Sequence, residues 1–343
     1  MGVEEQTGEA PVIVEPKAPL GGDPIAGAAP IPAPERPPPN PDLDEFPWYD
    51  LLVDLEEGQC APFIGAGACY PHLPLGGDVA RAWSAEHDYP FDDTWNLVRV
   101  AQYLATKLDD NEAPKRRIID RLKAGDAKPP DFSRPDDPHG LLARLNLPLY
   151  MTTNYDGYMV KALAANGRPD ARQLHCNWWG RIEKDAAGNA VEKEPDAPTI
   201  AAPVVYHLHG RLGERKSLVL TEDDYLNFLI NVSRDEKRLP SFVRAAFKSK
   251  RMLFIGYSLE DVNFKVLLRQ AQRNAEGEES AQHIAVQLPP NPKVNNLPDH
   301  TLREKQASYL RKQFNSQRIK VCYCDCRQFA AELSRRWQER KAP

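Results

Sequence analysis

The sequence of 343 residues lacks several features that would assign its class at once. No apolar run approaches the ~18 residues that a membrane-spanning helix needs. No sign of charge dominates, since 44 Lys and Arg residues stand against 49 Asp and Glu, so the overall charge does not favour nucleic acid or anionic lipid as a partner. The N-terminal residues show neither the basic nor the apolar segment of a secretory signal. We therefore expect a soluble cytoplasmic protein without direct membrane or nucleic-acid contact.

Cysteine is also scarce, and the spacing of the 6 residues is not that of a structural zinc site. Such sites normally use paired C-x2-C sequences, which place two thiolates on one turn, and the sequence contains no such pair. Cys322, Cys324 and Cys326 alternate instead, which predicts a strand that carries all three thiols on one face. We expect reduced, packed thiols and no zinc.

Proline is abundant, and its distribution predicts a domain boundary. Residues 1–47 hold 12 of the 32 prolines. Chain of this composition buries too little apolar surface to offset the entropy lost on ordering, and it favours an extended, solvated form. The sequence therefore predicts a disordered leader over residues 1–45 and a single folded domain over residues 46–343.

Within the predicted domain, short apolar runs alternate with segments that have helical spacing of apolar residues. This alternation predicts an α/β fold in which helices cover both faces of a parallel sheet. The charged, proline-broken stretch 106–138 predicts a helical surface insertion, and residues 180–200 predict an exposed hairpin or loop. Strands are predicted at Ala61–Ile64 and within 145–156, 202–210, 217–220, 251–256, 283–288 and 319–326.

Four predicted strands end in glycine-rich or polar turns, with the sequences FIGAGA, YMTTNYD, VYHLHG and LFIGYSLED. Ligands of open parallel sheets bind beyond the carboxyl ends of the strands, so the four turns predict one shared site. The turn at Gly65, Ala66 and Gly67 lets backbone amides approach a phosphate. A tight turn with close packing is the alternative, because the third glycine of the dinucleotide fingerprint is absent.

The other turns offer polar side chains to the same site. Asn154 can hold a ribose hydroxyl or a water molecule, and Asp156 can orient that group, although both could instead bond their own backbone. His209 stands at the end of its strand and suits general-base chemistry near neutral pH, whereas His207 is its competitor with a structural role. The turn that holds Gly256, Ser258 and Asp261 suits a phosphate or a ribose hydroxyl, or a helix N-cap.

In this order and at these separations, GAG, TTNYD, HLHG, the LTEDDY segment and LFIGYSLED resemble the sirtuin-like domains of bacterial antiviral defence proteins, over about residues 50–270. The resemblance implies a Rossmann-like NAD-binding domain that hydrolyses NAD+ to nicotinamide and ADP-ribose. It implies that Asn154 and His209 are the catalytic pair, assisted by Asp156. The implied nucleotide contacts are Gly65, Ala66, Gly67 and Cys69 for the pyrophosphate, Gly256, Ser258 and Asp261 for the adenosine half, and Thr153 elsewhere in the same nucleotide site.

The sequence departs from that family at two points. Protein-deacylating sirtuins carry a zinc ribbon with two C-x2-C pairs, which this sequence lacks, so hydrolysis is favoured over deacylation. Cys69 stands where the family commonly has serine, and a thiol is the poorer hydrogen-bonding group. We expect an NAD-depleting defence enzyme gated by homo-oligomerisation or by a partner defence protein. The alternatives are a deacylase or ADP-ribosyltransferase, or a non-enzymatic sensor of NAD+ or ADP-ribose.

Overall fold

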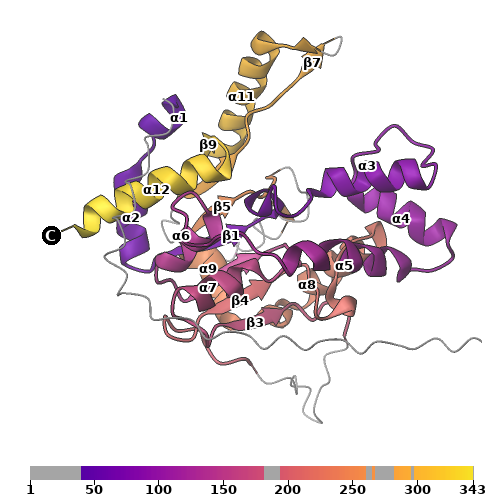
Figure 1. The fold of residues 1–343 in the computed structure, drawn as a ribbon, viewed down its shortest axis with the longest axis horizontal. Coiled ribbons are helices and arrows are strands. Elements are labelled where there is room, and N and C mark those ends of the chain that lie inside the picture. Colours follow the sequence, from indigo (N-terminus) through magenta and orange to yellow (C-terminus); the bar gives the residue numbers. More distant parts are fainter. Residues whose placement is uncertain (1–39, 181–193, 260–264, 267–281, 295–296, 343) are drawn as a thin grey trace, which may run out of the picture. The chain divides into compact units, whose positions relative to one another are not determined.

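The computed structural model describes residues 40–180, 194–259, 265–266, 282–294 and 297–342. Its centre is a sheet of seven parallel strands in the order β3-β4-β2-β1-β5-β6-β9 (Figure 1), which confirms the predicted Rossmann-like α/β fold. The strands are β1 (Cys60–Ile64), β2 (Leu149–Thr152), β3 (Arg172–His175), β4 (Val204–His207), β5 (Arg251–Ile255), β6 (His283–Gln287) and β9 (Ile319–Tyr323). A separate antiparallel pair consists of β7 (Lys293–Val294) and β8 (Leu297–Pro298).

The sheet is buried on both faces, which explains why its strands read as short apolar runs. Alternate residues of one strand point to opposite faces. In β1, Cys60 and Ile64 join one hydrophobic cluster, whereas Ala61 and Phe63 join the other. The two clusters are therefore the two interfaces between the sheet and its helices.

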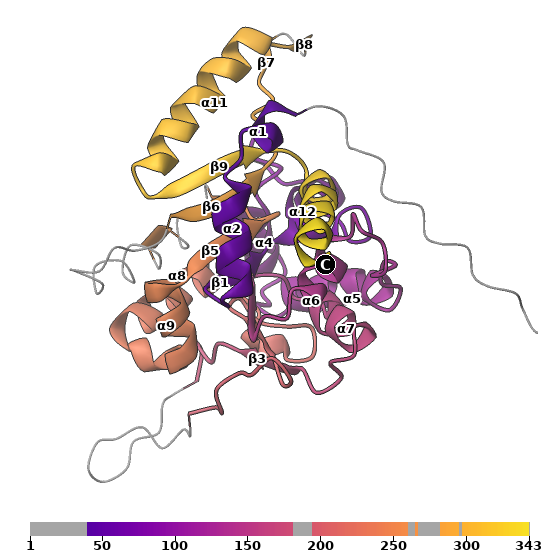
Figure 2. The same ribbon diagram turned by 90° about the vertical axis from the view of Figure 1, so that its left-hand side faces the viewer.

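Helices cover both faces of the sheet, as Figure 2 shows. The first face is covered by α2 (Trp48–Glu56), α6 (Pro138–Arg144), α7 (Tyr158–Ala165) and α12 (Cys326–Lys341). Buried residues of the same hydrophobic cluster also come from α3 (Gly76–Glu86), α4 (Leu97–Lys107) and α5 (Ala113–Asp126). The opposite face is covered by α8 (Glu222–Arg234), α9 (Ser241–Ser249) and α11 (His300–Asn315). Short turns of helix are α1 (Pro41–Asp44) and the 3₁₀ segments η1 (Ala66–Cys69), η2 (Arg215–Ser217) and η3 (Glu236–Arg238).

The helix predicted within residues 106–138 is confirmed as α5, but this helix is not confined to the surface. Helix α5 lies inside this stretch, and its Ile118, Ile119 and Leu122 are buried in the first-face cluster. The charged residues of α5 that misled the prediction lie mainly on its outer side. The overall charge of a segment does not reveal a buried stripe that recurs at helical spacing.

Three local predictions are also corrected. Residues 217–220 form the end of η2 and an extended segment rather than a strand, since an apolar run of four is too short to decide its own structure. The half-buried β3 was not predicted, because its sequence RQLH has no apolar alternation. Cys326 is the first residue of α12 and so does not share the strand that carries Cys322.

Folded structure begins earlier than the boundary predicted at residue 46. Helix α1 starts at Pro41, capped by the Asn40 side chain, which accepts from the backbone of Asp42. Leu43 is buried on this helix, and Phe46 packs on the ring of Trp48. These apolar contacts hold α1 in the folded domain despite the local proline content.

No helix in the described part of the chain is long and apolar enough to cross a membrane. Of the predicted loop at 180–200, residues 181–193 lie outside the described residues, as does most of the helix predicted after Ser258.

Candidate functional site

A cavity of about 1660 Å³ lies at the carboxyl ends of the central strands. The turns that follow β1, β2, β4 and β5 all contribute to its wall, as the strand-end rule predicts. Residues predicted for the site that line this cavity are Ala66, Gly67, Cys69, Thr153, Asn154, Asp156, His209, Gly256 and Ser258. Gly65 does not line it, and Asp261 lies outside the described residues.

The glycines of the first turn serve close packing between β1 and β5. The amide of Gly65 donates to Ile255 O and that of Gly67 donates to Gly256 O, each at 2.9 Å. A Cβ on Gly65 would lie 2.5 Å from Gly256 O, so no larger residue fits there. The turn leads into a 3₁₀ segment of four residues rather than into a long helix. The close-packing alternative therefore accounts for Gly65, and the two bonded amides are not free to bind a phosphate.

Asn154 is held in place on three sides. Its backbone amide donates to Thr152 Oγ1 at 2.9 Å, and its carbonyl oxygen lies 2.9 Å from His207 Nδ1. Its side-chain Nδ2 donates to Cys69 Sγ at 3.2 Å. Because a carbonyl only accepts, His207 carries its proton on Nδ1 and donates. The side chain of Asn154 is thus fixed at the cavity wall.

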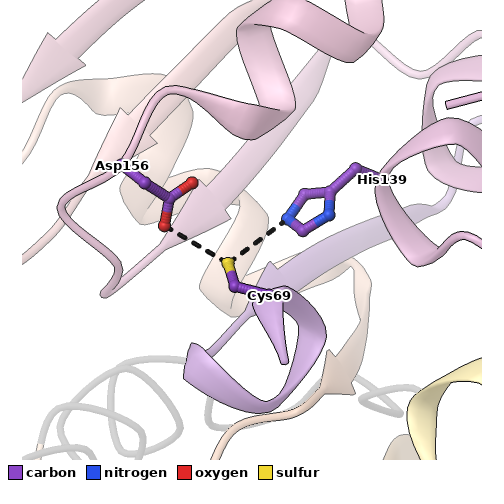
Figure 3. A group of neighbouring side chains, drawn as sticks. All are labelled: Cys69, His139 and Asp156. Carbon is purple, nitrogen blue, oxygen red and sulfur yellow. Dashed lines mark hydrogen bonds between the residues drawn. The ribbon is translucent and has the colours of Figure 1, made fainter. Parts of the chain in front are cut away.

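Cys69 lies between Asp156 and His139, as Figure 3 shows. Its Sγ donates to Asp156 Oδ2 at 3.3 Å and lies 3.8 Å from His139 Nε2. Burial raises the pKa of the Cys69 thiol well above its ordinary value, and the negative charge of Asp156 adds to that effect. Burial also raises the pKa of Asp156, while it lowers the pKa of His139 to about 4. Cys69 is therefore a thiol at neutral pH.

The two histidines of the β4 turn have different surroundings. His209 lines the cavity, and its ring meets those of Tyr225 and Phe228 edge-on, with centroids 5.3 and 5.2 Å away. His207 is not a lining residue, and burial lowers its pKa to about 4. The prediction that His207 anchors the turn through a hydrogen bond agrees with its bond to Asn154 O.

Gly210 leaves no open space beside His209. Its φ is +91°, and a Cβ would lie 2.2 Å from Ser217 O. The glycine is required because the chain turns sharply against the segment after η2, where Val219 N donates to His209 O at 3.0 Å. Gly210 therefore positions the backbone of His209.

Other cavity residues were not singled out from the sequence. Tyr225 belongs to the LTEDDY segment, which the resemblance includes, and Gln287 ends β6, where the strand-end rule could have found it. Arg134 and Arg327 also line the cavity and both pair with Asp136. No local sequence pattern could have predicted that these two arginines meet, because they are 193 positions apart in the chain.

A family model described as a SIR2-like domain matches residues 148–319, which is half of the chain. The chain is 26% identical over 240 residues to the protein named NAD(+) hydrolase ThsA of Acinetobacter baumannii (strain 532279), covering 69% of this chain and 44% of that protein. It is 27% identical over 223 residues to the protein of the same name from Cytobacillus dafuensis, with coverage of 64% and 39%. The counterpart in Bacillus cereus (strain MSX-D12) is 27% identical over 264 residues, with coverage of 72% and 46%. The chain spans less than half the length of these relatives.

Proposed function

The chain belongs to the SIR2-like family, and on that premise we propose that it hydrolyses NAD+ to nicotinamide and ADP-ribose in the cavity at the strand ends. The observation that carries the proposal is that Asn154, Asp156 and His209, from the turns after β2 and β4, line the same cavity. The names of the relatives, NAD(+) hydrolase, support the same activity. The cavity volume of about 1660 Å³ exceeds the ~300–1,000 Å³ of ordinary small-molecule pockets and suits an extended dinucleotide.

Hydrolysis of NAD+ requires little acid catalysis by the protein. Nicotinamide is bonded to ribose through a cationic ring nitrogen, so it leaves as a neutral molecule without protonation. The bond that breaks leaves positive charge on the anomeric carbon, and water then attacks that carbon. The protein has to position the ribose, exclude other nucleophiles and deliver the water molecule.

The catalytic roles follow from how each side chain is held. Asn154 presents its amide oxygen to a ribose hydroxyl or to the attacking water, while its Nδ2 is held by Cys69 Sγ. His209 takes the proton that the water loses, because it is the cavity-lining histidine. Asp156 accepts a hydrogen bond from Cys69 and so helps to orient the sulfur that holds Asn154. His207 positions Asn154 from behind.

In this proposal the nucleotide lies beyond the carboxyl ends of β1 and β5, which are neighbours in the sheet. Ala66, Gly67, Cys69 and Thr153 face its diphosphate side, and Gly256 and Ser258 face the adenosine half. Asp261 keeps its proposed adenosine contact. Because the Gly65 and Gly67 amides are bonded within the protein, side chains and the remaining amides of these turns carry the phosphate contacts.

We extend the proposal to a biological role on the resemblance described above. The chain acts in the bacterial cytoplasm as an NAD-depleting effector of antiviral or anti-plasmid defence. Its activity is gated by homo-oligomerisation or by a partner defence protein, because an unrestrained NAD+ hydrolase would harm its own cell. A full turnover rate from the isolated monomer, unchanged by concentration or partners, would contradict the gating.

The decisive experiment incubates the purified chain with NAD+ and no acceptor, and quantifies products by chromatography and mass spectrometry. Nicotinamide and ADP-ribose in equal amounts are expected. Asn154→Ala should remove turnover at equal folded concentration, whereas His300→Ala, at an exposed position on α11, should not. Bound NAD+ that stays intact would replace the hydrolase proposal by a sensor, and turnover that requires an acylated or protein acceptor would replace it by a transferase.

A further inference from the structure

We propose that Cys69, His139 and Asp156 form a binding site for a divalent transition-metal ion of the zinc class. The three side chains come from η1, α6 and the turn after β2, and their donor atoms all lie within 4.8 Å of one another (Figure 3). All three are buried, with exposures of 2%, 1% and 6%. A thiolate, an imidazole and a carboxylate are the three ligand types that zinc takes in proteins.

Two of the three distances between the donors suit a tetrahedral ion, and the third is within 4.8 Å. Cys69 Sγ lies 3.3 Å from Asp156 Oδ2 and 3.8 Å from His139 Nε2. Ligands bound at ~2.0–2.3 Å in a tetrahedron lie at separations of this size. A nucleophilic Cys-His-Asp triad does not fit the arrangement, since the carboxylate contacts the sulfur and not the histidine.

Each donor is oriented by a contact other than the cluster itself. Tyr158 N donates to Asp156 Oδ1 at 2.9 Å, which leaves Oδ2 for the ion. Asn154 Nδ2 donates to Cys69 Sγ, a contact that stabilises a thiolate. The rings of Phe132 and Tyr158 meet the His139 ring edge-on and hold its plane. Such outer contacts commonly support metal ligands.

His139 is poorly satisfied without an ion. Among the described residues its Nδ1 has no hydrogen-bond partner, and its Nε2 has only the long contact to sulfur. A buried imidazole left in this way is unfavourable, because its ring nitrogens have lost their hydrogen bonds to water. A bond from Nε2 to a metal ion would replace that long contact, and the ring proton would then lie on Nδ1.

The ion has a path to the site. Cys69 and Asp156 line the large cavity, whereas His139 does not, so an ion enters from the cavity and keeps an open position toward it. The Cys69 thiol releases its proton to solvent as the metal–sulfur bond forms. The prediction of no zinc rested on the spacing of the cysteines; this site joins residues 70 and 87 positions apart, which spacing cannot reveal.

One consequence rests on the proposed function. A metal ion on Cys69 would lie beside Asn154 and would face the space assigned to the ribose and the diphosphate of NAD+. Zinc should therefore inhibit NAD+ hydrolysis.

The direct test titrates the reduced full chain with Co²⁺, which reports thiolate ligation by a near-ultraviolet charge-transfer absorption and tetrahedral geometry by its visible bands. One Co²⁺ per chain, displaced by Zn²⁺, is expected. Cys69→Ser should abolish the charge-transfer absorption. His139→Gln should weaken binding by more than the ~10–100-fold that loss of an outer-shell partner causes. Circular dichroism checks that each variant is folded. A folded sample of either variant is sufficient for the test.

The matched control is the double variant Cys322→Ser/Cys324→Ser, since these sulfurs lie 3.6 Å apart and are the competing thiol pair. It should keep the absorption. Absence of the absorption in the wild type at saturating Co²⁺, its persistence in Cys69→Ser, or its loss in the double variant alone would overturn the site.

A separate assay measures Zn²⁺ inhibition of NAD+ hydrolysis relative to each variant's own rate. Inhibition should be weaker in His139→Gln than in the wild type. If the wild type hydrolyses no NAD+, the proposed function fails while the cobalt spectrum still decides the metal site. Equal inhibition of both proteins would refute the link between the site and the activity.

Discussion

His207 donates a hydrogen bond from Nδ1 to the main-chain carbonyl of Asn154, 2.9 Å away and 53 positions earlier in the sequence. The bond ties the end of β4 to the turn after β2, and it turns the His207 ring away from ligand chemistry. His209, two residues on, lines the cavity instead. The two histidines at the end of β4 therefore have separate roles: His207 positions Asn154, and His209 faces the ligand cavity.

The first prediction separates these two histidines. His207→Ala should lower the free energy of unfolding by about 1–3 kcal/mol, because it leaves the half-buried carbonyl of Asn154 without its donor. His209→Ala should reduce NAD+ cleavage by ~10²–10⁴-fold, the usual contribution of a general base, with most NAD+ binding retained. Calorimetry measures binding and stability, and chromatography measures nicotinamide release. A folded but inactive His207 variant beside an active His209 variant would reverse the two assignments.

The second prediction concerns stability between pH 7 and 5. Burial lowers the pKa of His283 to about 4, and Met252 N donates to its Nδ1, so a proton on that nitrogen would break the bond. The folded state then binds fewer protons than the unfolded state between pH ~6.5 and ~4, so stability is fully present above pH ~6.5 and falls as the pH drops. At pH 5 the loss from His283 should be about 2 kcal/mol relative to pH 7. His207, with a pKa of about 4, should add a similar loss.

Urea denaturation of His283→Asn at both pH values checks this dependence. Asparagine keeps an acceptor near Nδ1 but does not titrate, so the difference between pH 7 and 5 should shrink by about 2 kcal/mol. The control is His300→Asn at an exposed position, which should keep the wild-type difference. An unchanged pH dependence in His283→Asn would show that this histidine does not link folding to pH.

The third prediction concerns the buried ion pair between α5 and α8. Lys115 Nζ lies 2.7 Å from Asp224 Oδ1, and both side chains are largely shielded from solvent. Asp224 Oδ2 also accepts from the backbone of Leu220 and Thr221 at the start of α8. Lys115→Met should destabilise the fold by about 3–5 kcal/mol, because it leaves a buried carboxylate without its counter-ion.

The neighbouring residue on the same helix supplies the control for that prediction. Arg116 pairs with Asp110 at the surface, so Arg116→Met should change stability by about 0–1 kcal/mol in thermal or urea unfolding. Equal effects of the two substitutions would mean that burial does not set the strength of the α5–α8 pair.

The fourth prediction uses two glycines with nearly the same backbone angle. Gly256 has a φ of +68° and Gly58 has a φ of +67°. A Cβ on Gly256 would lie 2.3 Å from Ala68 N, whereas a Cβ on Gly58 would meet nothing within 4 Å. Gly58→Ala should therefore cost about 1–2 kcal/mol of backbone strain, and Gly256→Ala should add about 1–3 kcal/mol of overpacking. Calorimetric unfolding compares them, and equal values would refute the close approach of the β1 and β5 turns.

Much of the site was predictable because two general rules act locally. Buried parallel strands have short apolar sequences, and ligands bind beyond the ends of such strands. The sequence alone therefore predicts that Asn154, His209 and Ser258 belong to one site. The same reasoning failed at residues 217–220 and at β3, because runs of four residues carry too little pattern. It recognised the helix that became α5 but missed its burial, because the charges of this helix conceal a buried apolar stripe.

The sequence by itself determined the parallel α/β fold and the family resemblance, since both follow from residues close together in the chain. Tertiary structure alone decided which distant residues meet. It brought His139 to Cys69 across 70 positions and Lys115 to Asp224 across 109. It also showed that Gly65 serves packing rather than ligand binding, because only the fold sets the β5 turn against it. Such contacts depend on how helices pack on the sheet, and no local pattern of residues records that packing.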